Sequence, residues 1–272
     1  VTGKIDEFAP KAKIIHIDVD PAEISKRRPV DLGLLGDLCT MLPRLAQKLD
    51  ISPWLAMCDA LKSANAWRYD RPGDHIYAPA LLKQLSDMKP KGSVVCCDVG
   101  QHQMWVAQHM AFDGPDTHLS SGGLGAMGFG LPAAIGAQMA KPDRCIINVA
   151  GDGSFMMNVQ ELATVRRYHL PIKIVIMDNQ RLGMVKQWQQ LFFEERYSET
   201  ILSDNPDFVR LAEVFDIPGR RIEKMDAVLP ALQEMINAPG AYLLHVKINP
   251  DDNVWPLVPP GAANDNMLEE KP

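Results

Sequence analysis

The chain has 272 residues, which is enough for one large domain or two ordinary domains with a buried core. Its net charge of -6, with both signs interspersed, lacks the basic patch of a nucleic-acid-binding protein. No apolar run reaches the roughly 18 residues that a membrane-spanning helix needs, so we expect neither nucleic acid nor membrane as a partner.

The cysteines and histidines show no spacing typical of a disulfide framework or a metal site. The cysteines are odd in number, and they include no C-x-x-C pair. The histidines include no H-x-x-x-H spacing. We therefore predict reduced thiols in a cytoplasmic protein. The cysteines are Cys39, Cys58, Cys96, Cys97 and Cys145.

The first 50 residues have the alternating pattern of an α/β domain. We interpret them as the closing part of a nucleotide-binding-type domain, and we expect the N-terminal part of a longer protein to be missing. Residues 51–78 are mixed in composition and contain several prolines, which predicts a linker. The elements predicted before it are strand 13–19, a short helix 21–26 that begins at a proline, strand 31–37 and helix 39–49.

Residues 79–272 form the second predicted domain, in which helical segments alternate with short apolar strands. Continuous apolar strands are typical of a parallel sheet covered on both faces. We predict an α/β fold with a doubly wound, mostly parallel sheet and helices on both faces. The predicted strands are 93–100, 145–150, 173–179, 220–224 and 242–248. The predicted helices are 78–88, one that ends near 168, 183–195, 207–214 and 227–238.

The sequence GDGS, residues 151–154, follows directly after an apolar strand and places Asp152 at its carboxyl end. Asn179 stands at the carboxyl end of the next strand. Neighbouring parallel strands lie roughly 5 Å apart, so two oxygen ligands would meet at the rim if these strands are neighbours. One carboxylate and one amide suit Mg²⁺, which usually also takes phosphate oxygens and water.

The glycines on either side of Asp152 have their own interpretation. Gly151 and Gly153 allow a ligand to approach the backbone closely, and the free N–H groups at a helix start favour an anion. The stretch therefore predicts a site for a diphosphate bridged by Mg²⁺. Asn158 and Glu161 have the spacing of a capping box for the helix that follows. The alternative is a plain strand-to-helix turn capped by Asp152, and Asn179 argues against it.

A competing motif, G-x-G-x-x-G, covers residues 123–128 and is typical of dinucleotide-binding domains. Its context differs from that of such domains. It follows the polar stretch THLSS rather than an apolar strand, and no strand ending in an acid follows about twenty residues later. The context disfavours a nicotinamide-dependent dehydrogenase.

The spacing from GDGS to Asn179 resembles the signature of thiamine diphosphate enzymes. Three further stretches resemble the large catalytic subunits of acetohydroxyacid synthases, also called acetolactate synthases, of the isozyme II type. They are VGQHQMW at 99–105, SGGLGAMGFGLPAAIGAQ at 121–138 and GMVKQWQQLFFEERYSET at 183–200. The resemblance covers nearly the whole chain, and it implies the end of a central FAD-binding-type domain followed by a thiamine diphosphate-binding domain.

The resemblance implies an enzyme that uses thiamine diphosphate and Mg²⁺ to decarboxylate pyruvate. It would condense the product with pyruvate or 2-oxobutanoate to give 2-acetolactate or 2-aceto-2-hydroxybutanoate for branched-chain amino-acid biosynthesis. Metal ligation falls on Asp152, Asn179 and the main-chain carbonyl of Arg181, where the family often has an acid. Catalytic roles fall on Met127, Met184 and Trp188. Cofactor contacts fall on Val99, Gly100, Gln101, His102, Gly125, Met127, Gly151, Asp152, Gly153, Ser154, Asn179, Gly183, Met184 and Val185.

Met184, Val185, Trp188 and Phe192 share one face of the helix predicted to begin at residue 183. Their spacing indicates a buried amphipathic stripe, and the resemblance implies that this helix also forms a wall of the active site. The tryptophan would then help to select the second keto acid. Because one methylene is worth roughly 1–3 kcal/mol in such a pocket, we predict a preference for 2-oxobutanoate over pyruvate.

The resemblance also implies partners outside this sequence. FAD would contact the central domain near Asp18 and Asp37, and either acid is equally explained as an ordinary strand end. The activating glutamate would come from the N-terminal domain of a partner subunit, so we expect the isolated chain to be inactive. We expect a homodimer or tetramer with a small regulatory subunit. Pyruvate oxidase, glyoxylate carboligase and a non-catalytic cofactor-binding module are the alternatives.

Overall fold

The computed structural model describes residues 2–71 and 73–269, which fall into two compact units. One unit comprises residues 68–254, and the other comprises the described residues before and after it. All the chemistry predicted around Asp152 belongs to the unit of residues 68–254.

The first unit contains two parallel strands and two helices. Strand β1 (Ile15–Asp18) pairs with β2 (Leu32–Leu35), and α1 (Leu38–Leu45) follows directly. The short helix expected over 21–26 is wrong, because these residues form turns. The segment expected as a linker contains α2 (Ser52–Ala64), which begins with a proline in its first turn, where a missing N–H costs nothing.

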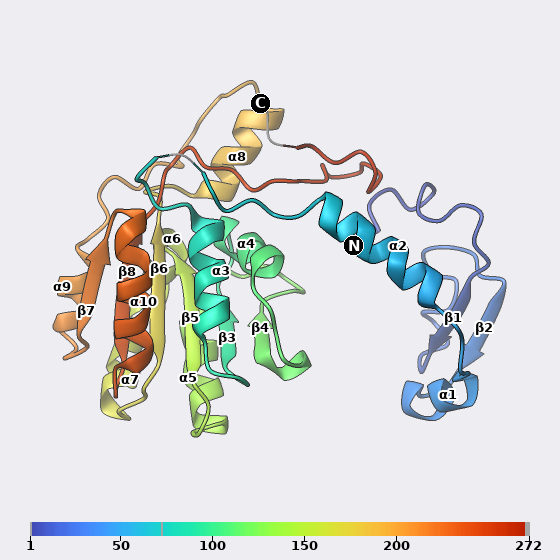
Figure 1. Ribbon diagram of the computed structural model, residues 1–272, viewed down its shortest axis with the longest axis horizontal. Coiled ribbons are helices and arrows are strands. Elements are labelled where there is room, and N and C mark those ends of the chain that lie inside the picture. The colour runs from blue at the N-terminus through green and yellow to red at the C-terminus, as the bar shows by residue number, and fades with distance from the viewer. Residues whose placement is uncertain (1, 72, 270–272) are drawn as a thin grey trace. The chain divides into compact units, whose positions relative to one another are not determined.

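The second unit is built on one six-stranded sheet with the order β4-β3-β5-β6-β8-β7, in which every pairing is parallel (Figure 1). This confirms the predicted α/β class with a mostly parallel sheet. The strands are β3 (Val94–Cys97), β4 (His118–Ser120), β5 (Ile146–Gly151), β6 (Lys173–Asp178), β7 (Gly219–Ile222) and β8 (Tyr242–Lys247).

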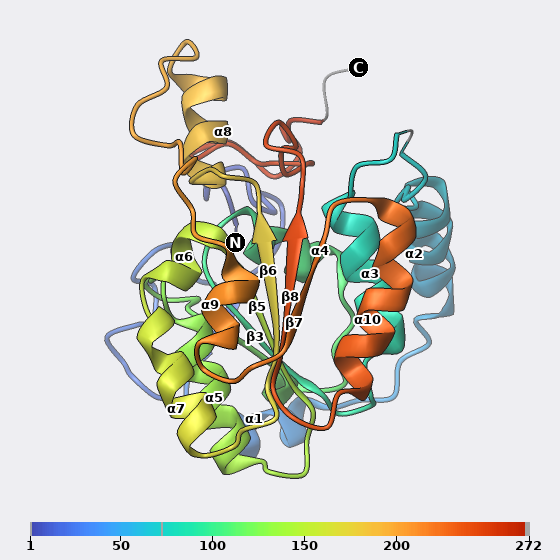
Figure 2. The same cartoon turned by 90° about the vertical axis from the view of Figure 1, so that its left-hand side faces the viewer.

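Helices cover both faces of this sheet, as predicted (Figure 2). Helices α5 (Gly130–Ala140), α6 (Asp152–Met156), α7 (Leu162–Arg167) and α9 (Phe208–Glu213) lie on one face. Helices α3 (Ala78–Met88), α4 (Gln101–His109) and α10 (Val228–Asn237) lie on the other. Helix α8 (Gly183–Phe192) lies beyond the carboxyl ends of the strands. Three short 3-10 turns complete the unit: η1 (Pro115–Thr117), η2 (Val159–Glu161) and η3 (Met225–Ala227).

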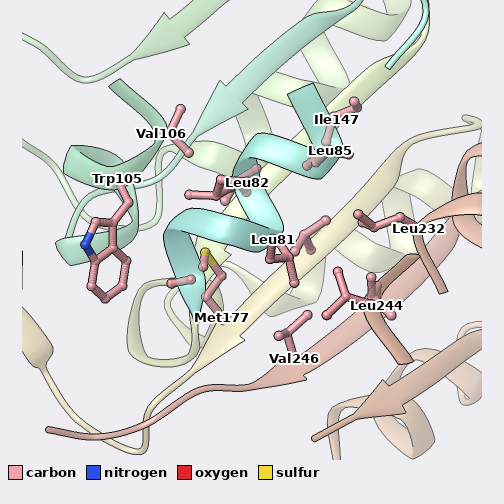
Figure 3. Close-up of a cluster of buried hydrophobic side chains, with 14 of the residues drawn as sticks. Leu81, Leu82, Leu85, Trp105, Val106, Ile147, Met177, Leu232, Leu244 and Val246 are labelled. Carbon is pink, nitrogen blue, oxygen red and sulfur yellow. The ribbon is translucent and has the colours of Figure 1, made fainter. Parts of the chain in front are cut away.

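Alternate residues of each strand contribute to two separate cores. Val95 and Cys97 of β3 pack with α3, α4 and α10, whereas Val94 and Cys96 pack with the opposite helices. Figure 3 shows the first core, in which Leu81, Leu82 and Leu85 of α3 meet side chains of β5, β6 and β8. Burial on both faces explains why these strands are apolar throughout.

The single helix predicted after GDGS is instead three short pieces, α6, η2 and α7. The predicted capping box is wrong, because the Asn158 side chain caps no helix and donates to the carbonyl of Gly128 at 2.7 Å. At this break, the Asn158 side chain bonds to a distant loop rather than to its own helix. Among the described residues, no helix is long and apolar enough to cross a membrane, and the cysteines are free thiols.

Candidate cofactor and metal site

Two oxygen-bearing side chains stand at the same edge of the sheet. Strands β5 and β6 are hydrogen-bonded neighbours, with Gly151 in register with Met177. Asp152 follows β5 and Asn179 follows β6, so both lie at the carboxyl edge, and both are buried. In open parallel sheets, ligands bind at this edge. A carboxylate and an amide placed there form a set of oxygen donors that suits a small hard cation.

A second carboxylate, Asp178, lies near Asp152 and contributes to its raised pKa. Its Oδ2 accepts from His245 Nε2 at 2.8 Å and from Lys247 Nζ at 2.9 Å. Burial alone would raise the pKa of Asp178, but these two donors outweigh it and hold that pKa below its usual range. Burial, and then the charge of Asp178, raise the pKa of Asp152 to about 7. The repulsion between the two carboxylates therefore raises the pKa of Asp152 rather than that of Asp178. A bound cation would offset this repulsion.

The amide of Asn179 is held by a chain of buried amides. Its Nδ2 donates to Gln101 Oε1 at 3.1 Å, and its Oδ1 accepts from the Arg181 N–H at 3.0 Å. Gln101 Nε2 donates to Gln187 Oε1 at 3.0 Å and to the Asp252 carbonyl at 3.1 Å. Gln187 in turn bonds the Val254 main chain through both its side-chain atoms. These contacts fix which way the Asn179 oxygen points.

The two glycines of the GDGS turn lie where no side chain fits. A Cβ at Gly151 would lie 2.9 Å from His102 Nδ1, and a Cβ at Gly153 would lie 2.9 Å from Leu182 Cδ2. Both distances are shorter than any ordinary carbon contact. The absence of a side chain at these two positions lets His102 and Leu182 pack against the turn.

His102 is buried beside this turn as a neutral ring. Its Nε2 accepts from the Gly151 N–H at 3.2 Å, so the neutral tautomer carries its proton on Nδ1. Burial lowers the pKa of His102 to about 3, and the hydrogen bond to the Asp98 main chain only partly opposes it. His102 can therefore donate a hydrogen bond from an uncharged ring at neutral pH.

We expect the His102 shift to make the chain sensitive to acid. As pH falls below about 6.5, the His102 ring binds a proton in the unfolded chain, whereas in the folded chain it stays neutral until about pH 3. The folded chain therefore loses stability as pH falls through this range. Between these pH values, the free energy of unfolding of the His102→Gln variant should depend on pH less steeply than that of wild type, by about 1.4 kcal/mol per pH unit. Urea unfolding at about pH 4.5, 5.5 and 6.5 measures that slope for each protein. His169→Asn, at an exposed turn, is the control; equal slopes in wild type and His102→Gln would contradict the account.

The glycine-rich run at 123–128 connects β4 with α5. The polar stretch before it does form a strand, contrary to expectation, because β4 is an edge strand that pairs on one side only. The N–H groups of Gly128 and Gly130 each donate to the Asp98 carboxylate at 2.9 Å. Since a carboxylate of the chain already takes these donors, they are not available to the pyrophosphate of a dinucleotide.

One cavity of ≈ 270 Å³ opens at this edge of the sheet. The predicted site residues that line it are Val99, Gly100, Gln101, His102, Gly125, Met127, Gly151, Asp152, Gly153, Ser154, Asn179, Arg181, Gly183, Met184 and Val185. Residues from β5, β6, the glycine-rich loop and the starts of α4, α6 and α8 thus meet at one place. The other three predicted residues, Trp188, Asp18 and Asp37, do not line this cavity.

These three residues have other surroundings. Trp188 packs edge-on against Phe192 one turn further along α8, with ring centroids 5.4 Å apart. Asp18 ends β1, and its Oδ1 accepts from the Asp20 N–H at 2.9 Å. Asp37 is the N-cap of α1 and accepts from the Cys39 N–H at 2.8 Å. Because β1 and β2 are parallel, both acids stand at the carboxyl edge of that small sheet.

Sequence reasoning missed several residues that support the cavity. Asp98 and Asp178 both end apolar strands, so the signal that singled out Asp152 was present for them too. Gln187 is fully buried in α8, a position where an exposed polar residue would be the default expectation. Asn205, whose Nδ2 donates to Asp152 Oδ2 at 2.7 Å, lies in an irregular segment and has no sequence signal.

Comparison with known proteins agrees with this geometry. The model of the family described as "Thiamine pyrophosphate enzyme, C-terminal TPP binding domain" matches residues 98–246. The model described as "Thiamine pyrophosphate enzyme, central domain" matches residues 1–45. Thiamine pyrophosphate is another name for thiamine diphosphate. The first match covers more than half of the chain and contains every predicted residue of the cavity.

Similar proteins include the acetolactate synthase isozyme 2 large subunit of Escherichia coli (strain K12), 60% identical over 99% of this chain and 49% of its own length. The acetolactate synthase large subunit of Parasynechococcus marenigrum is 42% identical over 98% of this chain and 44% of its own length. Acetolactate synthase 1, chloroplastic, of Oryza sativa subsp. japonica is 39% identical over 98% of this chain and 44% of its own length. The chain spans less than half the length of each of these relatives. It belongs to the thiamine pyrophosphate enzymes and carries their C-terminal cofactor-binding domain.

Proposed function

We propose that the cavity binds thiamine diphosphate through Mg²⁺ held by Asp152, Asn179 and the main-chain carbonyl of Arg181. The observation that carries this proposal is the meeting of Asp152 and Asn179 at the ends of two hydrogen-bonded strands, on the wall of one cavity. The residues fit the group, because both side chains offer oxygen and the Asn179 amide is already oriented by Gln101.

The remaining cavity residues would contact different parts of the cofactor. Gly100, Gln101, His102, Gly153 and Ser154 would contact the diphosphate, since they surround the turn that carries Asp152. Gly125 and Met127 would face the aminopyrimidine. Val99, Gly151, Gly183, Met184 and Val185 would form the surrounding wall, with Met127 and Met184 the apolar contacts at the reacting end.

We propose that this chain serves in an acetohydroxyacid synthase. Thiamine diphosphate supplies the electron sink for decarboxylating a 2-keto acid, and the protein binds, orients and excludes water. The substrates would be pyruvate and a second pyruvate or 2-oxobutanoate. Support comes from the similar acetolactate synthases and from the presence of every residue proposed to bind the metal and thiamine diphosphate on the wall of one cavity.

An assay of the three alternative products tests this activity. Acetolactate as the product from pyruvate supports the proposal, whereas acetyl phosphate would indicate a pyruvate oxidase and tartronate semialdehyde from glyoxylate would indicate a carboligase. We propose that the 272-residue chain alone is silent, because the glutamate that would activate the cofactor is expected on a partner subunit. Robust acetolactate production by the purified chain would refute that part.

Substitution of Trp188 should change the choice of second substrate. Trp188 does not line the cavity itself, but it belongs to α8, whose first residues Gly183, Met184 and Val185 do line it, and it would act there on the second substrate. In the active protein, Trp188→Leu should lower the preference for 2-oxobutanoate over pyruvate about 10-fold, as expected for losing one methylene's worth of contact. The ratio of the two products from mixed substrates measures it, with Phe193→Leu as an exposed aromatic control. An unchanged ratio for Trp188→Leu would remove this role.

We further propose FAD and subunit partners for the first unit and the whole protein. Asp18 and Asp37 share one strand edge, and carboxylates placed there can bond ribose hydroxyls. Asp37 gives Oδ1 to the cap of α1 and keeps Oδ2 for such a contact. A homodimer or tetramer of catalytic subunits with a small regulatory subunit is the proposed assembly.

A further inference from the structure

Asn205 touches the proposed metal ligand Asp152 from a segment far away in the sequence. Its Nδ2 donates to Asp152 Oδ2 at 2.7 Å, and the same nitrogen lies 3.5 Å from Asp178 Oδ1. Asp152 is only 2% exposed, so its carboxylate is oriented by the protein rather than by bulk water. The position of Asn205 therefore decides which Asp152 oxygen remains for a ligand.

The segment that carries Asn205 is tied to the loop of Asn179. The Leu182 N–H donates to the Thr200 carbonyl and the Leu202 N–H donates to the Gln180 carbonyl, both at 2.9 Å. The side chain of Leu202 also packs against the GDGS turn, since a Cβ at Gly153 would lie 3.0 Å from its Cδ1. On the other side, Asp207 caps α9 through the Val209 and Arg210 N–H groups. Asn205 is thus fixed at both ends.

The chemistry of its neighbours fixes the amide orientation as well. A side-chain amide has two N–H donors on nitrogen and only acceptor lone pairs on oxygen. Two carboxylates face Asn205, so the nitrogen must point towards them. Asp178 already accepts from His245 and Lys247 on its other oxygen, which leaves Asp152 as the carboxylate that depends on Asn205.

We propose that Asn205 is a positioning residue that holds Asp152 as a one-oxygen ligand and so makes the site select Mg²⁺ over Ca²⁺. This inference rests on the proposed function. Mg²⁺ takes six ligands in near-ideal octahedral geometry and accepts single carboxylate oxygens, whereas Ca²⁺ takes 6–8 and readily binds both oxygens of one carboxylate. Because Asn205 occupies one lone pair of Oδ2, Oδ1 is the more available oxygen of Asp152, and ligation through a single oxygen suits the smaller ion.

The test is the affinity of the 272-residue chain for each metal in the presence of thiamine diphosphate. MgCl₂ and CaCl₂ are titrated separately into wild type, Asn205→Ala and Asn205→Leu, and binding is followed by calorimetry. Leucine keeps the size of asparagine but cannot donate. Loss of an outer hydrogen-bond partner typically weakens metal binding about 10–100-fold, and we expect this for Mg²⁺. Ca²⁺ binding should weaken much less, so the preference for Mg²⁺ falls.

Asn237→Ala is the matched control, because Asn237 is an exposed asparagine at the end of α10, away from the cavity. Metal-free melting curves show whether each variant remains folded. Equal loss for both metals, or no loss in either Asn205 variant, overturns the inference while the proposed function stands. A wild-type chain that binds no thiamine diphosphate with either metal overturns the proposed function and this inference with it.

Discussion

The Asp152→Ala variant should lose thiamine diphosphate binding that depends on Mg²⁺. Asp152 supplies the carboxylate of the proposed metal site, and its loss removes the charge that a divalent cation needs. The expected loss in Mg²⁺ affinity is more than about 100-fold, beyond the range for losing an outer partner. Calorimetry of the chain with Mg²⁺ and thiamine diphosphate measures it. Asp143→Ala changes an exposed aspartate just before β5, at the opposite edge of the sheet, and should bind like wild type.

In the absence of metal, removing the charge of Asp152 should stabilise the folded chain. Because the pKa of Asp152 is raised to about 7, its contribution to stability is present at low pH and is lost as pH rises through that value. At pH 8, which is about one unit above it, the charged carboxylate opposes folding. Asp152→Asn should therefore raise the free energy of unfolding of the metal-free chain while weakening metal binding. A variant that binds Mg²⁺ normally would show that Asp152 is only a structural turn residue.

Substitution of Gly183 by alanine should damage the site through packing alone. A Cβ at Gly183 would overlap Gln101 Oε1 and lie 2.5 Å from Asn179 Nδ2. Gln101 cannot move freely, because Gln187 and the Asp252 carbonyl hold its nitrogen. We expect a loss of about 1–3 kcal/mol in the free energy of unfolding, as for other overpacked positions, together with weaker cofactor binding. Urea unfolding and calorimetry check the two effects.

Gly136 provides the control for this substitution. It lies inside helix α5, and a Cβ there would meet nothing within 4 Å. Gly136→Ala should stabilise the chain by about 0.5–1 kcal/mol, since alanine is the better helix former. If both glycine variants gave the same change, the close contact with Gln101 and Asn179 would not determine the effect of Gly183→Ala.

The sheet and the meeting of Asp152 and Asn179 at one of its edges could be predicted from sequence because each depends on a local pattern. Apolar strands such as 145–150 and 173–179 identify themselves by burial on both faces, and their ends place Asp152 and Asn179. The remaining cofactor positions from 99 to 185 came from resemblance to known motifs. Without that resemblance, the favoured interpretation of Met127 is an ordinary core methionine.

Other features depend on contacts between distant segments, which no local pattern specifies. Asn158 has the spacing of a cap, yet it bonds to the Gly128 carbonyl 30 positions away. Asn205 reaches Asp152 only because residues 200–202 pair with the loop at 180–182. Gln187 is buried because the segment that ends at Val254 passes over it. Such partners become visible only when the chain is folded.

The central claim is that the cavity at the carboxyl edge of the sheet holds thiamine diphosphate by means of a metal ion. A calorimetric titration of the wild-type chain with thiamine diphosphate tests it most directly, in Mg²⁺, in EDTA, and with NAD in place of the cofactor. The structure predicts binding of thiamine diphosphate in Mg²⁺, loss of that binding in EDTA, and no binding of NAD. Binding of NAD, or no binding of thiamine diphosphate at saturating Mg²⁺, would contradict it.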